Sequence, residues 1–207
     1  MNDQRPDVSV IVANYNGAAH LRAALCSVLD QTLTSLEVLV VDDASSDGSV
    51  REIRAIAAED RRVRLFTQLK NAGPGAARNL ALAQARGRWL AVFDSDDLMA
   101  PDRLERLVER AMQDGAQIVA DDLQVFSEAD LVGRSFLGNE REARWVDLAG
   151  FIATSRMYAR TPNLGYLKPL ISSDLVTRCR ARYREDLRIG EDYDFMLQLL
   201  ASGARVR

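Results

Sequence analysis

Over its first 121 residues, the chain alternates short apolar runs with segments of helical spacing, and this alternation constrains the fold most. Each apolar run has the length of a buried strand. The runs lie at residues 8–13, 37–41, 63–66, 89–93 and 118–120, with helical spacing in 21–29, 49–56, 75–85 and 101–112. Strands that alternate with helices predict an α/β fold, with a mostly parallel central sheet flanked by helices.

This regular alternation ends after Asp122. Residues 123–170 show no βα rhythm, although a helix near residues 145–156 is expected, and helical spacing returns at 191–200. We interpret this half as a less regular, substrate-facing region on the same sheet. The final residues, 204–207, resemble the start of another strand, so we expect the chain to be a truncated part of a longer protein.

Composition excludes several classes of function. A net charge of −3, spread evenly, leaves no basic face for nucleic acid. One histidine and two cysteines without metal-ligand spacing argue against a zinc site or a histidine-based triad. No apolar stretch approaches the ~18 residues of a membrane-spanning helix. We therefore expect reduced thiols and a cytoplasmic location, with any peripheral membrane association made through segments outside this chain.

The run at 89–93 leads directly into three carboxylates, Asp94, Asp96 and Asp97. The rigid end of a buried strand is where open α/β sheets carry their sites. Three adjacent acids repel one another unless a cation neutralises them, and oxygen ligands favour a hard ion such as Mg²⁺ or Mn²⁺. A polar turn that caps the helix after Pro101 explains one of these acids, but not all three.

Three other strand ends are also polar. Asn14 and Tyr15 fit a glycine-closed turn as well as a surface on which a nucleobase stacks. Asp42 and Asp43 lie too far from the next helix to cap it easily, and suit a base or a ribose. The glycines of segment 71–79 permit close backbone approach, and Arg78 can reach a diphosphate, although a solvated arginine after a Gly-Pro turn is the alternative.

The last polar segment, residues 190–195, places Glu191, Asp192 and Asp194 after a glycine. Acidic residues in a first helical turn are favourable against the helix dipole, which is sufficient to explain them. A general base held at a rigid helix start fits equally well, because the charge of Glu191 raises the pKa of its neighbour.

Together these segments resemble glycosyltransferase family 2, the inverting family with the GT-A fold, and are similar to bacterial exopolysaccharide transferases of the succinoglycan type. The resemblance rests on five segments in the family's order: residues 8–16, 40–49, 71–79, 93–97 and 190–194. It implies one GT-A domain over residues 1–207, with a nucleotide-sugar-binding half at 1–121 and an acceptor-side half at 122–207.

The resemblance also implies roles for individual residues. Asp192 matches the catalytic base, and Asp94 and Asp96 match the D-x-D motif that binds the ribose and a divalent cation, with Asp97 as an alternative ligand. The remaining nucleotide-sugar contacts are expected from Asn14, Tyr15, Asp42, Asp43, Arg78 and Ser95. The implied cofactor is Mg²⁺ or Mn²⁺, the donor a UDP-sugar by preference, and the acceptor a saccharide or a lipid-linked saccharide.

One family feature is absent, since no Q-x-x-R-W motif of processive members appears in the chain. Either a single sugar is added or that motif lies beyond Arg207. Two other functions compete with transfer. A sugar-1-phosphate nucleotidyltransferase needs a glycine-rich loop with arginine directly after the first strand, which residues 14–17 do not match. A non-catalytic nucleotide-sugar-binding module is the second alternative, and intact Asp96 and Asp192 argue against it.

Overall fold

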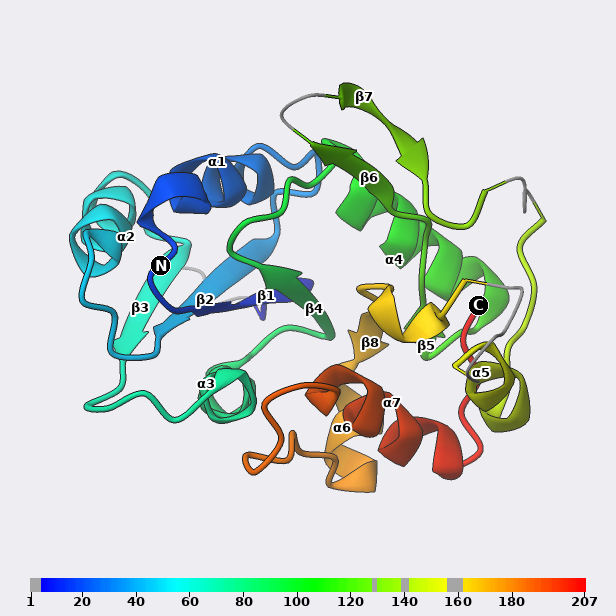
Figure 1. The fold of residues 1–207 in the computed structure, drawn as a ribbon. Helices are drawn as coiled ribbons and strands as arrows, with labels where there is room; N and C mark the ends of the chain where they lie inside the picture. Colours follow the sequence, from blue (N-terminus) through cyan, green and yellow to red (C-terminus); the bar gives the residue numbers. More distant parts are fainter. Residues whose placement is uncertain (1–4, 128–129, 139–141, 156–161) are drawn as a thin grey trace.

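The computed structural model describes residues 5–127, 130–138, 142–155 and 162–207, and it places helices on both faces of a central sheet (Figure 1). The sheet has six strands in the order β3-β2-β1-β4-β8-β5. They are β1 (Val8–Asn14), β2 (Leu36–Asp42), β3 (Val63–Thr67), β4 (Trp89–Asp94), β5 (Ile118–Val119) and β8 (Leu170–Ser172). Strands β1 to β4 are parallel, whereas β8 is antiparallel to β4 and β5. The predicted α/β fold with a mostly parallel sheet is confirmed.

Alternate residues of the central strands enter two hydrophobic cores, one on each face of the sheet. Val10 and Val12 of β1 belong to the first core, while Ile11 belongs to the second. Helices α1 (Ala18–Leu29), α2 (Ser49–Glu59) and α4 (Arg103–Asp114) close the first core. Helices α3 (Pro74–Gln84), α5 (Leu148–Thr154), α6 (Ser173–Cys179) and α7 (Glu191–Ala201) close the second. Burial on both faces explains why these strands are continuously apolar in sequence.

The strand register brings the predicted site residues to one edge of the sheet. Asn14 is paired with Asp42, and Ala13 is paired with Asp94. The carboxyl ends of β1, β2 and β4 therefore finish level with one another. This is the edge at which open α/β sheets bind their ligands.

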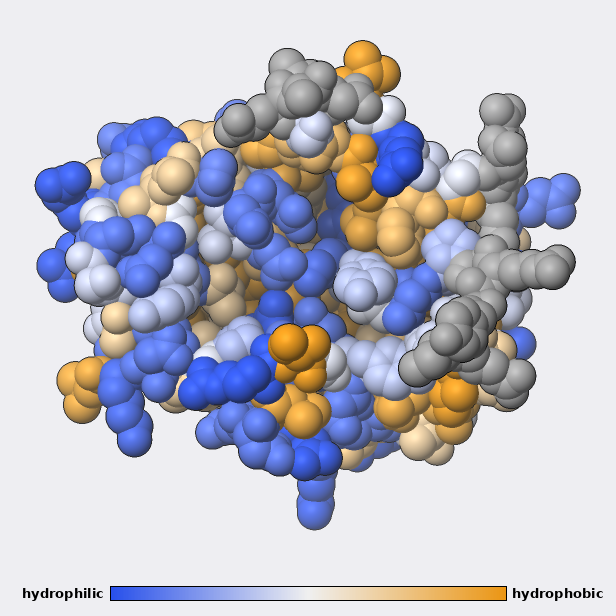
Figure 2. Space-filling model, in the orientation of Figure 1, coloured by the Kyte–Doolittle hydropathy of each residue, from blue (hydrophilic) through white to orange (hydrophobic). Residues whose placement is uncertain are grey.

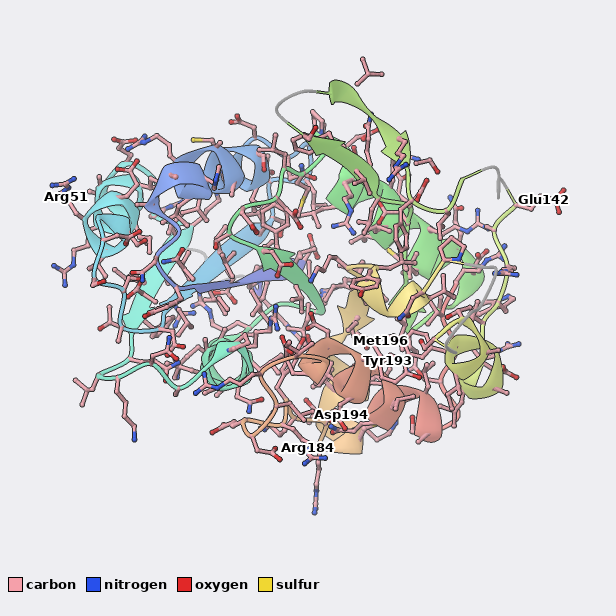
Figure 3. The ribbon with its side chains drawn as sticks, in the orientation of Figure 1. Arg51, Glu142, Arg184, Tyr193, Asp194 and Met196 are labelled. Carbon is pink, nitrogen blue, oxygen red and sulfur yellow. The ribbon has the colours of Figure 1, made fainter. Side chains whose placement is uncertain are left out.

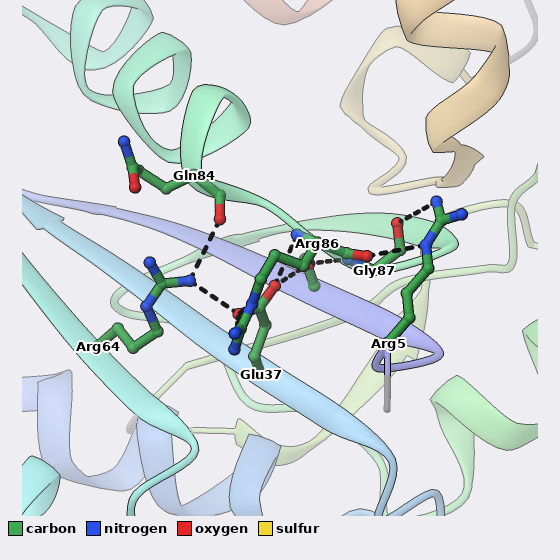
Figure 4. A network of polar contacts seen from close by, with 7 residues as sticks. Arg5, Glu37, Arg64, Gln84, Arg86 and Gly87 are labelled. Atoms are coloured by element: carbon green, nitrogen blue, oxygen red, sulfur yellow. Dashed lines mark hydrogen bonds and ion pairs between the residues drawn. The ribbon is translucent and has the colours of Figure 1, made fainter. Parts of the chain in front are cut away.

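The opposite edge is tied by an ion-pair network around the buried Glu37 of β2 (Figure 4). Its carboxylate accepts hydrogen bonds from Ser9 Oγ at 2.7 Å, Arg64 Nη1 at 2.9 Å and the Arg86 amide at 2.8 Å. Arg5 in turn donates to the carbonyl oxygens of Arg86 and Gly87. The network fixes the amino ends of β1, β2 and β3 against the turn before β4.

The less regular second half contains elements that sequence periodicity did not predict. A hairpin of β6 (Gln124–Ser127) and β7 (Asp130–Ser135) stands apart from the main sheet, and a short 3₁₀ helix, η1 (Leu164–Tyr166), precedes β8. The expected helix near 145–156 is α5. The strand-like end is also confirmed, because Val206 forms bridges with Ile118 and Val146.

One core position differs from what the helical spacing of residues 101–112 predicts. That spacing places Met112 on the inward face with Leu104 and Leu107, but the Met112 side chain is 73% exposed, whereas Ala111 is buried. The buried stripe of α4 follows Leu104, Leu107 and Ala111. A residue one position beyond Ala111 rotates off that stripe, by about 100° along a helix.

In the described part of the chain, no helix is long and apolar enough to cross a membrane. Figure 2 shows the face of Figure 1 hollowed near its middle, with mainly hydrophilic residues around the hollow.

Candidate functional site

Asn14 and Asp42, at the ends of β1 and β2, are buried and hydrogen-bonded to each other. Asn14 Nδ2 lies 2.9 Å from Asp42 Oδ2, and Asp42 also accepts from the amide of Ser45 at 2.9 Å and its hydroxyl at 2.6 Å. Asp42 therefore holds the turn after β2 in shape. Asn14 Oδ1 is buried and has no hydrogen-bond partner among the described residues, so it is the acceptor that this pair leaves available.

Asp43 is also buried, and it anchors the loop that leads into α3. Its two carboxylate oxygens accept the backbone N–H groups of Ala72 at 2.8 Å and Gly73 at 2.7 Å. This contact brings the two predicted nucleotide segments, 42–43 and 71–79, into one unit. The contact of Asp43 with a base remains a prediction, and the structure adds this loop-anchoring role to it.

Tyr15 lies at the same edge and exposes 54% of its surface. It follows β1 directly and precedes Asn16, whose φ of 52° lies in the left-handed region. The exposed ring is available for stacking, as the stacking prediction requires.

Arg78 lies at the centre of a cluster of charges that joins the two halves of the chain. Its guanidinium is buried, with Nη2 3.1 Å from Asp94 Oδ1 and Nη1 2.6 Å from Glu191 Oε1 and 3.2 Å from Asp192 Oδ1. It also lies 5.5 Å from the ring centre of the buried Tyr183. Arg78 Nε is buried without an acceptor among the described residues, so one donor of this fork is unused.

Lys168 is a second cation in this cluster, and sequence reasoning missed it. Its Nζ lies 2.7 Å from Asp94 Oδ2 and 3.3 Å from Asp192 Oδ2. It lies between η1 and β8, in a stretch without a readable motif. The available signal was a lone lysine beside a proline and a short apolar run that the structure shows to be a strand.

The charges of this cluster shift the pKa values of its members. Burial lowers the pKa of Arg78, but the charges of Asp192 and Asp94 outweigh it, and the net pKa is raised. Burial likewise lowers the pKa of Lys168, but the charge of Asp94 outweighs it, and the net pKa is raised. Burial raises the pKa of Asp94, but Lys168 and Arg78 lower it further, so this carboxyl is firmly ionised.

The acids that follow β4 are in a different situation. The pKa of Asp97 is raised, first by burial and then by the charges of Asp94 and Asp96. Neither Asp96 nor Asp97 forms an ion pair with any described residue, and no group of three or more His, Cys, Asp or Glu in the described part is arranged to hold a metal ion. The charges of Lys168 and Arg103 offset this shift only in part, whereas both oxygens of Asp94 contact cationic side chains directly. Ser95 follows Asp94 directly, and its hydroxyl lies so near the turn after β1 that a Cβ added at Gly17 would be 3.2 Å from it.

A pocket of about 620 Å³ lies over this cluster and is lined by Arg78, Asp94, Lys168, Asp192 and Arg188, among others. Arg188, a second residue that sequence reasoning missed, reaches back to Asn71 Oδ1 at 3.1 Å.

Asp194 does not line the pocket. It accepts a hydrogen bond from Gln198 at 2.7 Å, and Figure 3 shows it beside Arg184. Of the three acids at the start of α7, Glu191 and Asp192 therefore face the site.

Several known proteins resemble this chain. Residues 9–173 match the profile described as Glycosyl transferase family 2. The succinoglycan biosynthesis protein ExoO of Rhizobium meliloti is 44% identical over 98% of this chain and 58% of its own length. ExoU of the same organism is 35% identical over 97% of this chain and 59% of its own length. The chain thus spans about three-fifths of the length of these relatives.

Solved structures share the fold. The S. aureus TarS 1–349 structure in complex with UDP has a TM-score of 0.77 at 23% identity, over 97% of this chain and 57% of that one. The mannosyltransferase PcManGT from Pyrobaculum calidifontis, in complex with GDP-Man and Mn²⁺, has a TM-score of 0.71 at 25% identity, over 99% of this chain and 55% of that one. These are GT-A glycosyltransferases, so the fold and the succinoglycan-type resemblance expected from the sequence are confirmed. The profile match and the full-length similarity to ExoO show that this chain belongs to glycosyltransferase family 2.

Proposed function

We propose that this chain transfers a sugar from a nucleoside-diphosphate sugar, by preference a UDP-sugar, to a hydroxyl of a saccharide or a lipid-linked saccharide, with inversion at the anomeric carbon. The names of ExoO and ExoU support a role in bacterial polysaccharide synthesis. Donor-binding neighbours support the donor class, because TarS was solved with UDP and PcManGT with GDP-Man. Because the relatives are longer, the activity of the whole protein is part of this proposal.

The observation that carries the proposal is the placement of Asp192 in the pocket over Arg78 and Asp94. Its carboxylate lies 3.2 Å from Arg78 and 3.3 Å from Lys168, at the start of α7. In the proposed reaction, Asp192 accepts the proton of the acceptor hydroxyl. The hydroxyl oxygen forms a bond to the anomeric carbon, and the bond from that carbon to the diphosphate oxygen breaks. A single displacement of this kind inverts the anomeric centre.

In this proposal, Arg78 binds the diphosphate. A guanidinium presents a planar fork of donors that matches phosphate oxygens, and Arg78 Nε has no acceptor in the described part of the chain. Burial keeps water away from this charge, which strengthens its attraction to phosphate. Asn14, Tyr15, Asp42 and Asp43 are assigned to the nucleoside, in line with their common position at the sheet edge.

A divalent cation, Mg²⁺ or Mn²⁺, belongs to the same proposal. Asp96 and Asp97 would hold it, with Asp94 beside them, since burial and the charges of Asp94 and Asp96 raise the pKa of Asp97 even though Lys168 and Arg103 oppose the shift. When bound, such an ion neutralises charge that develops on the leaving diphosphate. PcManGT, solved with Mn²⁺, supports a divalent cation in this fold.

The test is to incubate the chain with UDP-glucose, UDP-GlcNAc, UDP-galactose and GDP-mannose in the presence of Mn²⁺, and to measure the release of free nucleotide. Release from at least one donor, at a rate above that of the donor alone, supports the proposal. Binding of UDP without any release favours the non-catalytic module. Formation of a nucleotide sugar from a sugar 1-phosphate and a nucleoside triphosphate would favour the nucleotidyltransferase.

The variant Asp192→Asn tests the mechanism. It keeps the shape of the side chain but removes the proton acceptor, so turnover should fall by about 10²–10⁴-fold. The affinity for UDP, measured by calorimetry, should change by less than about 2-fold, because Asp192 acts on the acceptor. If Asp192 only stabilises the start of α7, the change costs about 0.3–1 kcal/mol of stability and leaves turnover intact.

A further inference from the structure

Two cations contact Asp192, and each of them lies closer to a neighbouring carboxylate than to Asp192. Arg78 Nη1 lies 2.6 Å from Glu191 but 3.2 Å from Asp192. Lys168 Nζ lies 2.7 Å from Asp94 but 3.3 Å from Asp192. Each cation therefore makes one short contact with a neighbouring carboxylate and a longer one with Asp192.

This asymmetry matters for a base. A carboxylate in a short, charge-assisted contact is held strongly in its ionised form and is a poor proton acceptor. Asp192 is instead oriented by two longer contacts to cations, one to each of its oxygens, and by a hydrogen bond that the Tyr183 hydroxyl donates to it. Glu191 and Asp94 make the shorter contacts with the cations, and the cations reach the Asp192 carboxylate through the longer ones.

Lys168 is the less central of the two cations. Arg78 is deeply buried and also contacts Glu191 and the Tyr183 ring, so its removal would disturb much of the site. The side chain of Lys168 is 16% exposed, and its ammonium forms ion pairs with the carboxylates of Asp94 and Asp192. It comes from the segment between η1 and β8, in the second half of the chain, whereas Asp94 ends β4 in the first.

We propose that Lys168 is a positioning residue for the transfer reaction, which fixes the Asp192 carboxylate relative to Asp94 and so relative to the donor. This proposal rests on the proposed function, since it assigns Asp192 as the base. Lys168 acts through Asp192 and does not itself bind the diphosphate or take up a proton. The loss of its ammonium should leave the base in place but remove the contact that holds one of its two oxygens, so that the carboxylate is oriented less precisely toward the acceptor hydroxyl.

A double-mutant cycle tests this assignment. The variants are Lys168→Met, Asp192→Asn and the combination of the two, with turnover measured as nucleotide release from the most active donor of the panel, in the presence of Mn²⁺. The control is Lys70→Met, because Lys70 is the other lysine of the chain and is exposed. We expect Lys168→Met to lower turnover by about 10–100-fold, Lys70→Met to change it by less than 2-fold, and Lys168→Arg to restore part of the loss.

The decisive measurement is the effect of Lys168→Met in the Asp192→Asn variant. If Lys168 acts through Asp192, Lys168→Met should have an effect of less than 2-fold when Asp192 is already asparagine. UDP affinity by calorimetry should change by less than 2-fold in every variant. An equal loss in both backgrounds, or a 10-fold loss of UDP affinity, would overturn the assignment. So would wild-type turnover in Lys168→Met. If Asp192→Asn itself retains wild-type turnover, the base assignment of the proposed function fails instead.

Discussion

At the scale of single residues, the charged groups of this chain divide between two opposite edges of the sheet. Glu37 at the amino edge is surrounded by donors that satisfy it, whereas Asp97 at the carboxyl edge has a pKa raised by burial and by neighbouring acids. A buried carboxylate surrounded by donors stabilises a fold, while acids that repel one another are typical of a site. The two environments yield separate predictions for stability and for binding.

The first residue-scale prediction concerns Glu37→Gln. Burial raises the pKa of Glu37, but hydrogen bonds from Ser9, the Arg86 amide and Arg64 outweigh it, so the pKa is lowered from its ordinary value of 4.5. A carboxyl with a lowered pKa stabilises the fold above its ordinary pKa and loses that effect as the pH falls through its folded pKa. Glu37→Gln should therefore cost about 1.5–3 kcal/mol at pH 7, and the deficit should shrink in acid.

Urea unfolding at several pH values measures this effect. Glu59→Gln is the matched control, because Glu59 is exposed and its contact with Arg22 is long, at 3.9 Å. It should change stability by less than about 0.5 kcal/mol. A pH-independent deficit in Glu37→Gln would mean that the charge of Glu37 does not carry the stabilisation.

The second residue-scale prediction concerns Tyr15. Because its ring is exposed at the nucleotide edge, Tyr15→Ala should weaken UDP binding by about 1–3 kcal/mol, the usual range for stacking of a base on an aromatic ring. Tyr15→Phe keeps the ring and should cost much less. Calorimetry of UDP with Mn²⁺ measures both, and equal affinities for the alanine and phenylalanine variants would exclude stacking.

At the scale of elements, the loop before α3 depends on a backbone conformation that only glycine adopts readily. Gly73 has φ 96° and ψ 166°, and a Cβ there would lie 2.5 Å from Arg188 Nη1. Asp43 accepts two backbone N–H groups of this loop, and Arg188 donates a hydrogen bond to the side chain of Asn71 at its start. Its shape is thus fixed jointly by the end of β2 and by the segment that precedes α7.

Gly73→Ala should therefore reduce both stability and nucleotide binding. Strain at this φ and ψ costs on the order of 1–3 kcal/mol, and displacement of the loop should weaken UDP binding several-fold. Gly115→Ala is the control, because Gly115 also has a positive φ, 61°, but has nothing within 4 Å of an added Cβ. It should lose stability without losing UDP affinity. Unchanged UDP binding in Gly73→Ala would show that the loop does not shape the nucleotide site.

The regular elements were predictable, and the contacts between them were only partly so. Periodicity located β1 to β4 to within a residue or two at each end, because β1, β2 and β4 are largely apolar and buried on both faces, and β3 begins at the buried Val63. It did not reveal β8, since three residues leave no period to detect. Lys168 and Arg188 were missed for a related reason. Both lie outside regular elements and reach the site only because chain reversals bring them there.

At the scale of the whole molecule, the site joins residues from both halves of the chain, so a ligand that binds it should stabilise the entire fold. With Mn²⁺ and UDP at about 100 times its dissociation constant, mass action adds about 2.7 kcal/mol. For a chain of this size, each 1 kcal/mol raises the melting temperature by about 2–4 °C. The rise should be largely lost in EDTA, and it should be small in Asp96→Ala whether or not Mn²⁺ is present. An equal rise with EDTA would contradict a metal-dependent site.

The late insertion of β8 between β4 and β5 affects how the chain assembles. During synthesis, β5 leaves the ribosome about fifty residues before the strand through which it joins the sheet. Until residues 170–172 arrive, one edge of β4 has no pairing partner, and such edges promote aggregation. Contacts this distant in sequence also slow folding. The same connection that brings Lys168 to Asp94 therefore delays completion of the sheet until the second half of the chain has been translated.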